Sequence, residues 1–269
     1  DYEKTFTYYE SKDGTMVPLT YFHRKDLEIN TETPIFLYGY GGYNISIRPS
    51  FSRKYVGWLE LGGVVAIANL RGGGELGKKW HNAGRLKEKQ NVFDDFLYAS
   101  KYLEANNVGN RKSTVISGRS NGGLLVGTSL VQNPNYFGAT LPAVGVLDML
   151  RFTEFTEGWG WRGDYGSPLL SKKDFDFNFE ISPYHQLKEG ECYSPTLVTT
   201  GRRDDRVVPS HSYKFTARIQ EFQGCNNPVM LIDTVRAGHG SGGGAAMPKW
   251  KRIELFTSEQ AFALKHVSS

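Results

Sequence analysis

The stretch "ISGRSNGGLLVG", residues 116–127, decides the fold because it sets one serine between two different kinds of segment. Its centre, Gly118-Arg119-Ser120-Asn121-Gly122, fits the pattern Gly-x-Ser-x-Gly of a sharp turn that lifts a serine hydroxyl above a sheet. The chain holds 31 Gly among 269 residues. A random arrangement of its Gly and Ser gives roughly 0.25 such matches per chain. The pattern alone therefore settles nothing.

The segments on either side of Ser120 supply the setting that the pattern needs. Residues 113–118 form a short, β-branched run typical of a buried strand, and residues 121–133 have the composition of a buried helix. A nucleophilic serine of this kind sits where such a strand turns into such a helix. Pattern and setting together predict that Ser120 is a nucleophile.

Strand-like and helix-like segments alternate along the rest of the chain. The expected strands are short, rich in Val, Ile and aromatic residues, and lie at 34–40, 63–70, 113–118, 138–144, 195–201 and 228–234. This alternation predicts an α/β fold, with a mostly parallel central sheet and helices on both faces. Residues 1–30 predict a hairpin that leads into this sheet, with Asp13-Gly14 at its turn.

The clearest helix between these strands is 91–107, which has one apolar face and Asn91 as its expected N-cap. Further helices are expected to begin near Asn121, Ser210 and Pro248. The glycine-rich stretch "GHGSGGGAA", residues 238–246, is expected to be a mobile loop.

Length and composition fit a single domain over residues 1–269, with 39% hydrophobic and 22% charged residues. The net charge of +4 is spread among many acids, so the basic stripe of a nucleic-acid-binding protein is missing. No apolar run reaches the length of a membrane-spanning helix. We therefore expect no nucleic-acid partner and no membrane, and no motif implies a metal or another cofactor.

The two cysteines, Cys192 and Cys225, lack the spacing of a zinc site and are too few for a disulfide framework. Buried free thiols are the expectation. The N-terminal "DYEKTFTYYE" is polar and acidic, unlike a signal peptide. The chain begins without Met, so we expect that a signal or an upstream domain could have been removed. The compartment stays open: the cytoplasm is favoured, and a secreted or periplasmic location requires a removed signal.

A serine nucleophile needs a base, and the base needs an acid that orients it. In folds with this turn the chain order is serine, then an acid, then histidine. His239 fits, because it follows an expected strand in the glycine-flanked loop "RAGHGSG". The loop "GRRDDRVVP" after the preceding strand supplies the acid, and the sequence leaves Asp204 and Asp205 as alternatives.

The reaction also needs donors for a developing oxyanion. The backbone N–H of Asn121, directly after the serine at a helix N-terminus, is one candidate. The second is expected from the glycine-rich loop "LYGYGGYN", residues 37–44, where Tyr40 or Tyr43 could direct a hydroxyl into the site.

A rival motif lies in "GGGELGKK", where Gly72 and Gly77-Lys78 have the spacing of a phosphate-binding loop. Lys79 stands where that motif requires the hydroxyl of Ser or Thr to hold Mg²⁺. The glycines are better explained by close backbone packing, and we expect no nucleotide cofactor.

Eight motifs resemble, in order, the hydrolase domain of the prolyl oligopeptidase family: "LYGYGGYNISI", "ANLRGGGELGKKWH", "KQNVFDDF", "GRSNGGLLV", "VGVLDMLRF", "WRGDYGSP", "DDRVVPSHSYKF" and "AGHGSG". The resemblance runs over nearly the whole chain and implies the α/β-hydrolase fold. By position it implies that Ser120 is the nucleophile, Asp204 the acid and His239 the base. It also implies the Tyr40 hydroxyl and the Asn121 N–H as oxyanion donors.

The same resemblance implies a substrate pocket. Trp161 would stack on a substrate proline ring, Arg206 would bind the substrate backbone, and the walls would be Tyr43, Val146, Tyr165 and Val207. The sequence departs from the family at Glu154 and Glu157, because an apolar residue is expected at the second position. A carboxylate there is expected to admit basic substrate side chains.

These implications lead to a serine endopeptidase that cleaves short peptides after proline through an acyl-enzyme. The family carries a β-propeller before this domain, and no residues of this chain encode one, so the propeller is the expected partner in the whole protein. Four alternatives stay open: basic or alanine specificity, peptide macrocyclisation or transpeptidation, carboxylester hydrolysis, and a catalytically inactive binding domain.

Overall fold

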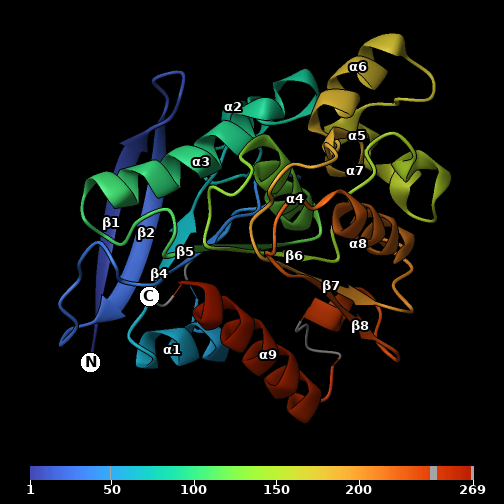
Figure 1. The fold of residues 1–269 in the computed structure, drawn as a ribbon. Helices are drawn as coiled ribbons and strands as arrows, with labels where there is room; N and C mark the ends of the chain where they lie inside the picture. Colours follow the sequence, from blue (N-terminus) through green and yellow to red (C-terminus); the bar gives the residue numbers. More distant parts are fainter. Residues whose placement is uncertain (49, 243–246, 268–269) are drawn as a thin grey trace.

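The computed structural model describes residues 1–48, 50–242 and 247–267, and its centre is a sheet of eight strands in the order β1-β2-β4-β3-β5-β6-β7-β8 (Figure 1). The strands are β1 (Tyr2–Glu10), β2 (Met16–Arg24), β3 (Ile35–Tyr38), β4 (Val64–Ala68), β5 (Thr114–Arg119), β6 (Ala139–Ala143), β7 (Thr196–Gly201) and β8 (Val229–Thr234). All six strands expected after the hairpin are present, each within a few residues of its expected ends.

The sheet is mostly parallel, as the alternation of segments predicts. β3 to β8 pair in parallel through β4-β3-β5-β6-β7-β8, and only the pairs β1–β2 and β2–β4 are antiparallel. β1 and β2 are the expected hairpin, and Gly14 at its turn has a φ of +83°, a value that glycine adopts without a steric penalty. Because β3 to β8 are parallel, the loops that follow them share one edge of the sheet.

Helices cover both faces of the sheet, and Figure 1 shows α3, α4 and α8 on one side with α1 and α9 on the other. Their bounds are α1 (Arg53–Glu60), α2 (Lys78–Asn82), α3 (Gln90–Ala105), α4 (Asn121–Gln132), α5 (Arg162–Tyr165), α6 (Lys172–Ile181), α7 (Pro183–Gln186), α8 (Ser210–Phe222) and α9 (Lys249–Val267). Short 3₁₀ turns lie at η1 (Leu86–Glu88), η2 (Phe152–Glu154), η3 (Gly158–Trp161) and η4 (His239–Gly242).

Alternating side chains of the central strands build two separate cores. In β3, Ile35 and Leu37 pack into the core beneath α3 and α4, whereas Phe36 between them joins Trp58 of α1 and Ala263 of α9 on the opposite face. Successive side chains of a strand point to opposite faces of the sheet, so a fully apolar strand is buried on both faces. This arrangement explains why the central strands read as continuous apolar runs.

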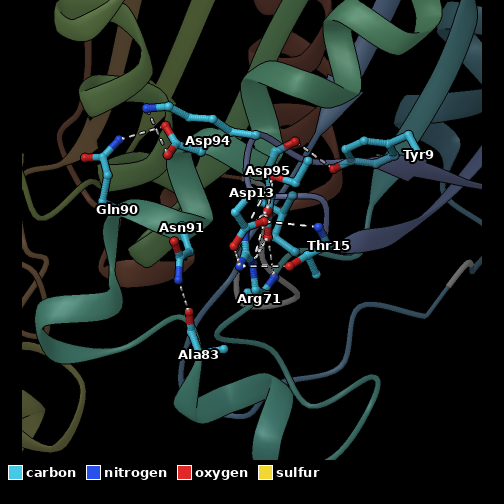
Figure 2. A network of polar contacts seen from close by, with 12 residues as sticks. Tyr9, Asp13, Thr15, Arg71, Ala83, Gln90, Asn91, Asp94 and Asp95 are labelled. Atoms are coloured by element: carbon cyan, nitrogen blue, oxygen red, sulfur yellow. Dashed lines mark hydrogen bonds and ion pairs between the residues drawn. The ribbon is translucent and has the colours of Figure 1, made fainter.

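The start of α3 differs from the sequence expectation. The helix begins at Gln90 with Lys89 in the N-cap position, and Asn91 lies inside its first turn. Asn91 is therefore not the cap; its Nδ2 donates instead to the carbonyl of Ala83 at 2.9 Å (Figure 2). The preference of Asn for capping is weaker here than its bond to the neighbouring turn.

Arg71, directly after β4, joins the hairpin to the body of the domain (Figure 2). Its guanidinium donates to the buried carboxylate of Asp95 in α3 and to Asp13 at the tip of the hairpin. The Asp95 Oδ1 also accepts from Ser11, and the Asp95 carbonyl accepts from Tyr9. Hydrogen bonds from Arg71 lower the pKa of Asp13 to about 2, so this carboxyl stays ionised at neutral pH.

The cysteines correct another expectation, because Cys192 and Cys225 form a disulfide rather than free thiols. They are separated by 33 residues in the chain and lie in the segments before β7 and before β8. These strands are parallel neighbours, so the segments that lead into them meet at the same edge of the sheet. Spacing in the sequence carries no trace of this proximity.

The expected mobile loop, residues 238–246, falls partly outside the described residues, since 243–246 lie beyond them. The part that is described is not a plain loop: His239 to Gly242 form the turn η4.

Candidate active site

Ser120 occupies the turn between β5 and α4 with a strained backbone, φ 58° and ψ −116°. Residues other than glycine rarely adopt this backbone conformation, and such strain is typical of a nucleophile at a strand-to-helix turn. Flanking glycines make the turn sterically feasible: a Cβ on Gly118 would lie 2.2 Å from the carbonyl oxygen of Gly122. A Cβ on Gly123 would lie 2.6 Å from the carbonyl oxygen of Ala143. The glycines are therefore required by close packing.

His239 and Asp204 form a hydrogen-bonded pair between the loops that follow β8 and β7. The distance from His239 Nδ1 to Asp204 Oδ2 is 2.8 Å, and the carboxylate is fully buried. The other oxygen of Asp204 accepts from the backbone N–H groups of Arg206 (3.0 Å) and Val207 (2.9 Å). An ionised carboxylate only accepts, so Nδ1 carries the proton and Nε2 is left with a lone pair.

The structure separates the two candidate acids. Asp204 is buried and bonded to His239, whereas its neighbour Asp205 is exposed and its carbonyl accepts from the Thr156 hydroxyl. Arg202, in the same loop, pairs with Asp233 at 2.6 Å.

The loop of His239 is tied to the turn of Ser120 through the residue before the serine. Arg119 Nη2 donates to the carbonyl oxygen of His239 at 2.7 Å. Within the part of the chain that the structure describes, Ser120 Oγ has no hydrogen-bond partner. The hydrogen bond between a catalytic serine and its base often tightens only when a substrate is bound.

The candidate oxyanion site lies between Asn121 and the loop that follows β3, which we call the oxyanion loop, residues 39–44. Three of its residues have positive φ: Gly41 (64°), Tyr43 (57°) and Asn44 (56°). Burial raises the pKa of Tyr40 to about 12, so its hydroxyl stays protonated and remains a donor near neutral pH. The backbone N–H of Asn121 opens the first turn of α4, where the helix dipole favours negative charge.

The residues expected to form the pocket belong to, or pack against, one large apolar cluster, the core beneath α3 and α4. Val146, Tyr165 and Val207 are buried in it, and Tyr43 and Trp161 are half-buried residues that pack against it. The cluster also contains Phe152, which the sequence did not single out; its ring is stacked with that of Trp161, 6.2 Å between centroids and 15° between planes. Trp161 is thus half-buried beside a second aromatic ring.

The charged residues near this cluster are at the surface. Arg206 is exposed, with its backbone fixed by Asp204. Glu154 and Glu157 are exposed on the short turns between β6 and α5. Thr156, between them, bonds to the carbonyl of Asp205, so this segment lies against the loop that carries Asp204.

Two residues behind the site were missed by sequence reasoning. Asp164 accepts from the backbone N–H of Tyr43 at 2.7 Å and pairs with His81 at 2.9 Å. Lys89 is buried and donates to Gly41 and Asn121. Both belong to motifs quoted for the resemblance, "WRGDYGSP" and "KQNVFDDF", which was the only signal in the sequence.

Among residues 1–48, 50–242 and 247–267, no group of three or more His, Cys, Asp or Glu side chains could hold a metal ion. None of the helices in this part of the chain has both the length and the apolar character needed to cross a bilayer.

Comparisons with known proteins identify the family of the chain. The model of the prolyl oligopeptidase family matches residues 49–269. A prolyl endopeptidase from Elizabethkingia miricola is 47% identical over 242 residues, which are 90% of this chain and 34% of that protein. A dual function macrocyclase-peptidase from Amanita bisporigera is 40% identical over 247 residues, again 90% of this chain and 34% of the relative.

Solved structures show the same relationship. A structure from an analysis of two prolyl endopeptidases superposes with a TM-score of 0.92 at 44% identity and covers 99% of this chain and 37% of its own. Prolyl oligopeptidase B from Galerina marginata, solved with a 35mer hydrolysis and macrocyclization substrate, gives a TM-score of 0.91 at 36% identity over the same shares.

The chain thus spans about a third of the length of the curated relatives it matches. Its mostly parallel sheet has helices on both faces, and its serine turn lies between β5 and α4. This is an α/β-hydrolase fold. Since the family model covers most of the chain, this chain belongs to the prolyl oligopeptidase family.

Proposed function

We propose that this chain is the catalytic domain of a serine endopeptidase that cleaves short peptides on the carboxyl side of proline. The observation that carries the proposal is the 2.8 Å pair of His239 and Asp204, on loops at the same edge of the sheet as the strained Ser120. Membership of the prolyl oligopeptidase family supports the substrate class.

The proposed reaction begins with Ser120 Oγ attacking the carbonyl carbon of the scissile bond while His239 Nε2 takes the hydroxyl proton. Asp204 holds the imidazole in the required tautomer and stabilises its positive charge. The tetrahedral oxyanion accepts from the Tyr40 hydroxyl and the Asn121 N–H. His239 then protonates the leaving amine, and an acyl-enzyme remains on Ser120.

In the second half of the reaction a water molecule gives its proton to His239 and attacks the acyl-enzyme. The peptide then leaves with a free carboxylate, and Ser120 recovers its proton. No step requires a cofactor. If an amine of the peptide replaces water, the product is a transpeptidated or cyclic peptide; a relative named as a macrocyclase-peptidase favours this second candidate.

The apolar face of Trp161 supports proline as the residue before the scissile bond, because a pyrrolidine ring is flat, apolar and carries no N–H that needs a partner. Tyr43, Val146, Tyr165 and Val207 are the proposed walls, and Arg206 is proposed to bind the substrate backbone. We further propose that the remaining length of the whole protein includes the β-propeller of the family.

The test is covalent labelling by a fluorophosphonate, followed by a ranking of kcat/KM across peptides with Pro, Ala, Arg or Lys before the scissile bond. We expect labelling to vanish in Ser120→Ala and cleavage to be fastest after Pro. Labelling that persists in Ser120→Ala would reject the nucleophile, and equal rates after Pro and Arg would reject the specificity. A simple aryl ester hydrolysed far faster than a prolyl amide would instead favour a carboxylesterase.

A further inference from the structure

Lys89 is a fully buried lysine at the N-cap position of α3. Its side chain is among the largest fully buried ones, with 1% of the residue exposed. Among the described residues, no carboxylate lies within ion-pair distance of its ammonium group. A buried cation without a directly paired carboxylate is costly in folding free energy. Such a residue therefore needs an explanation outside stability.

The contacts of Lys89 lead to the candidate oxyanion site. Its Nζ donates to the carbonyl oxygen of Gly41 at 2.8 Å and to Asn121 Oδ1 at 2.9 Å. The Tyr165 hydroxyl donates to the same Asn121 oxygen at 2.7 Å, and the Asn121 Nδ2 donates to the carbonyl of Tyr40. The ring centroid of Tyr165 lies 5.4 Å from Nζ.

These bonds fix the oxyanion loop from behind. The carbonyls of Tyr40 and Gly41 are both turned inward, toward Asn121 and Lys89. Gly41 has a positive φ and is packed so closely that an added Cβ would lie 2.3 Å from Val92. The loop is therefore closely packed, and Lys89 is one of the donors that hold it.

A neutral donor could make the same two hydrogen bonds, so the charge itself needs a reason. Lys89 bonds to the side chain of Asn121, whose backbone N–H is one proposed oxyanion donor at the N-terminus of α4. A cation beside the positive end of a helix is unfavourable in the resting protein. It becomes favourable once negative charge develops at that helix end, in a site of low dielectric constant.

We propose that Lys89 is a positioning residue for the proposed reaction, holding the oxyanion loop and stabilising the developing oxyanion with its positive charge. The inference rests on the proposed function and assigns no direct contact between Lys89 and the substrate. Lys89 acts through Asn121 and Gly41.

The proposal has a pH dependence. Burial lowers the pKa of Lys89 to about 8, and the negative charge of Asp164 opposes this shift. The Tyr165 ring lies 5.4 Å from the ammonium group, and the Asp164 carboxylate, which acts on Lys89, pairs with His81. Tyr40 and Tyr43 belong to the oxyanion loop that Lys89 contacts. The pKa values of the three tyrosines are raised by burial, to about 12 for Tyr40, so these hydroxyls stay protonated while Lys89 titrates.

Activity and stability should then move in opposite directions above pH 8. As the pH rises through about 8, the native state loses the Lys89 proton and the charge that favours the oxyanion. An unfolded lysine keeps its proton until about pH 10.4. Between these values the unfolded state binds more protons, so the contribution of this group to stability rises with pH.

The test compares the pH profile of kcat for the wild type, Lys89→Met and Lys89→Arg in the whole native protein that contains this chain. Lys101→Met is the matched control, because Lys101 is exposed on α3. We expect the wild-type kcat to fall as the pH rises through about 8, without a fall in melting temperature. Lys89→Met should lose about 10- to 100-fold in kcat at pH 7, with little change in KM and no alkaline limb near pH 8.

Lys89→Arg keeps its charge throughout this range, so it should retain more kcat than Lys89→Met and should also lack the limb. A wild-type kcat that is flat from pH 7 to about 10 overturns the proposal even if both variants fail to fold. So does a folded Lys89→Met with the wild-type kcat or limb. Hydrolysis of an aryl ester, which forms the same oxyanion, serves as substrate if prolyl peptides are not cleaved, so failure of the proposed function is seen separately.

Discussion

Asp204 and Asp205 follow β7 as neighbours, yet their carboxylates have different surroundings. The first is buried against His239, and the second faces solvent. Two consecutive side chains in a tight loop point in different directions, and the sequence does not say which one turns inward. The family resemblance chose Asp204, whereas reasoning from the loop alone left both open.

Asp204→Asn should lower kcat by about 10,000-fold with little effect on folding, because an amide favours the wrong tautomer of His239. Asp205→Asn is the matched control and should keep near-wild-type kcat. Steady-state kinetics on a prolyl amide check both. Equal losses in the two variants would remove Asp204 from its proposed role.

Tyr40 tests the proposed oxyanion site. Tyr40→Phe removes only the hydroxyl, so kcat should fall about 100- to 1,000-fold, as it does when one oxyanion donor is lost, while KM changes little. Single-turnover acylation rates measure the effect directly. Tyr38→Phe, on the strand just before the loop, is the control; a loss of the same size there would point to general disruption of the loop.

At the scale of elements, β3 to β7 were predictable because they are buried on both faces and are bounded by glycine or proline. The hairpin was predictable because its turn residues and its alternation of side chains agree. The contacts of Arg71 with Asp13 and Asp95 and the disulfide were not predictable, because both depend on which distant segments the sheet brings together. Lys89 is a similar case: nothing in "LKEKQN" tells its buried lysine from the two exposed charges before it.

The contacts of Arg71 with Asp13 and Asp95 lead us to expect a large effect on stability. Arg71→Met leaves the Asp95 carboxylate buried without its cation, so the free energy of unfolding should fall by about 3–5 kcal/mol. The double variant Arg71→Met, Asp95→Asn should recover part of this loss, since it removes the uncompensated charge. Urea unfolding measures both. A double variant less stable than Arg71→Met alone would contradict the explanation.

The disulfide closes a loop of 33 residues, so its removal should cost about 3–4 kcal/mol on the chain-entropy model. Cys192→Ser with Cys225→Ser, unfolded in urea under non-reducing conditions, gives this value. The wild type treated with a reductant should match the double variant. A wild type whose urea midpoint is unchanged by reductant would show that the bond is not formed in solution.

At the scale of the whole molecule, the chain spans about a third of the length of its curated relatives. We expect the rest of the protein, proposed to be a β-propeller, to limit the length of substrates. Cleavage of a short peptide and of an unfolded protein with the same proline site should be compared in the whole protein and in residues 1–269. The ratio of the two rates should favour the short peptide more strongly in the whole protein; identical ratios would remove this role.

The Cys192–Cys225 bond joins the beginnings of β7 and β8, and the loops at the far ends of these two strands carry Asp204 and His239. The two strands are thus linked covalently at one end, and at the other end they position the acid and the base. We expect reduction of the disulfide to weaken the pairing of β8, at the edge of the sheet, with β7. A reducing agent should therefore lower the rate of proton transfer at His239, although the disulfide lies at the opposite ends of the two strands.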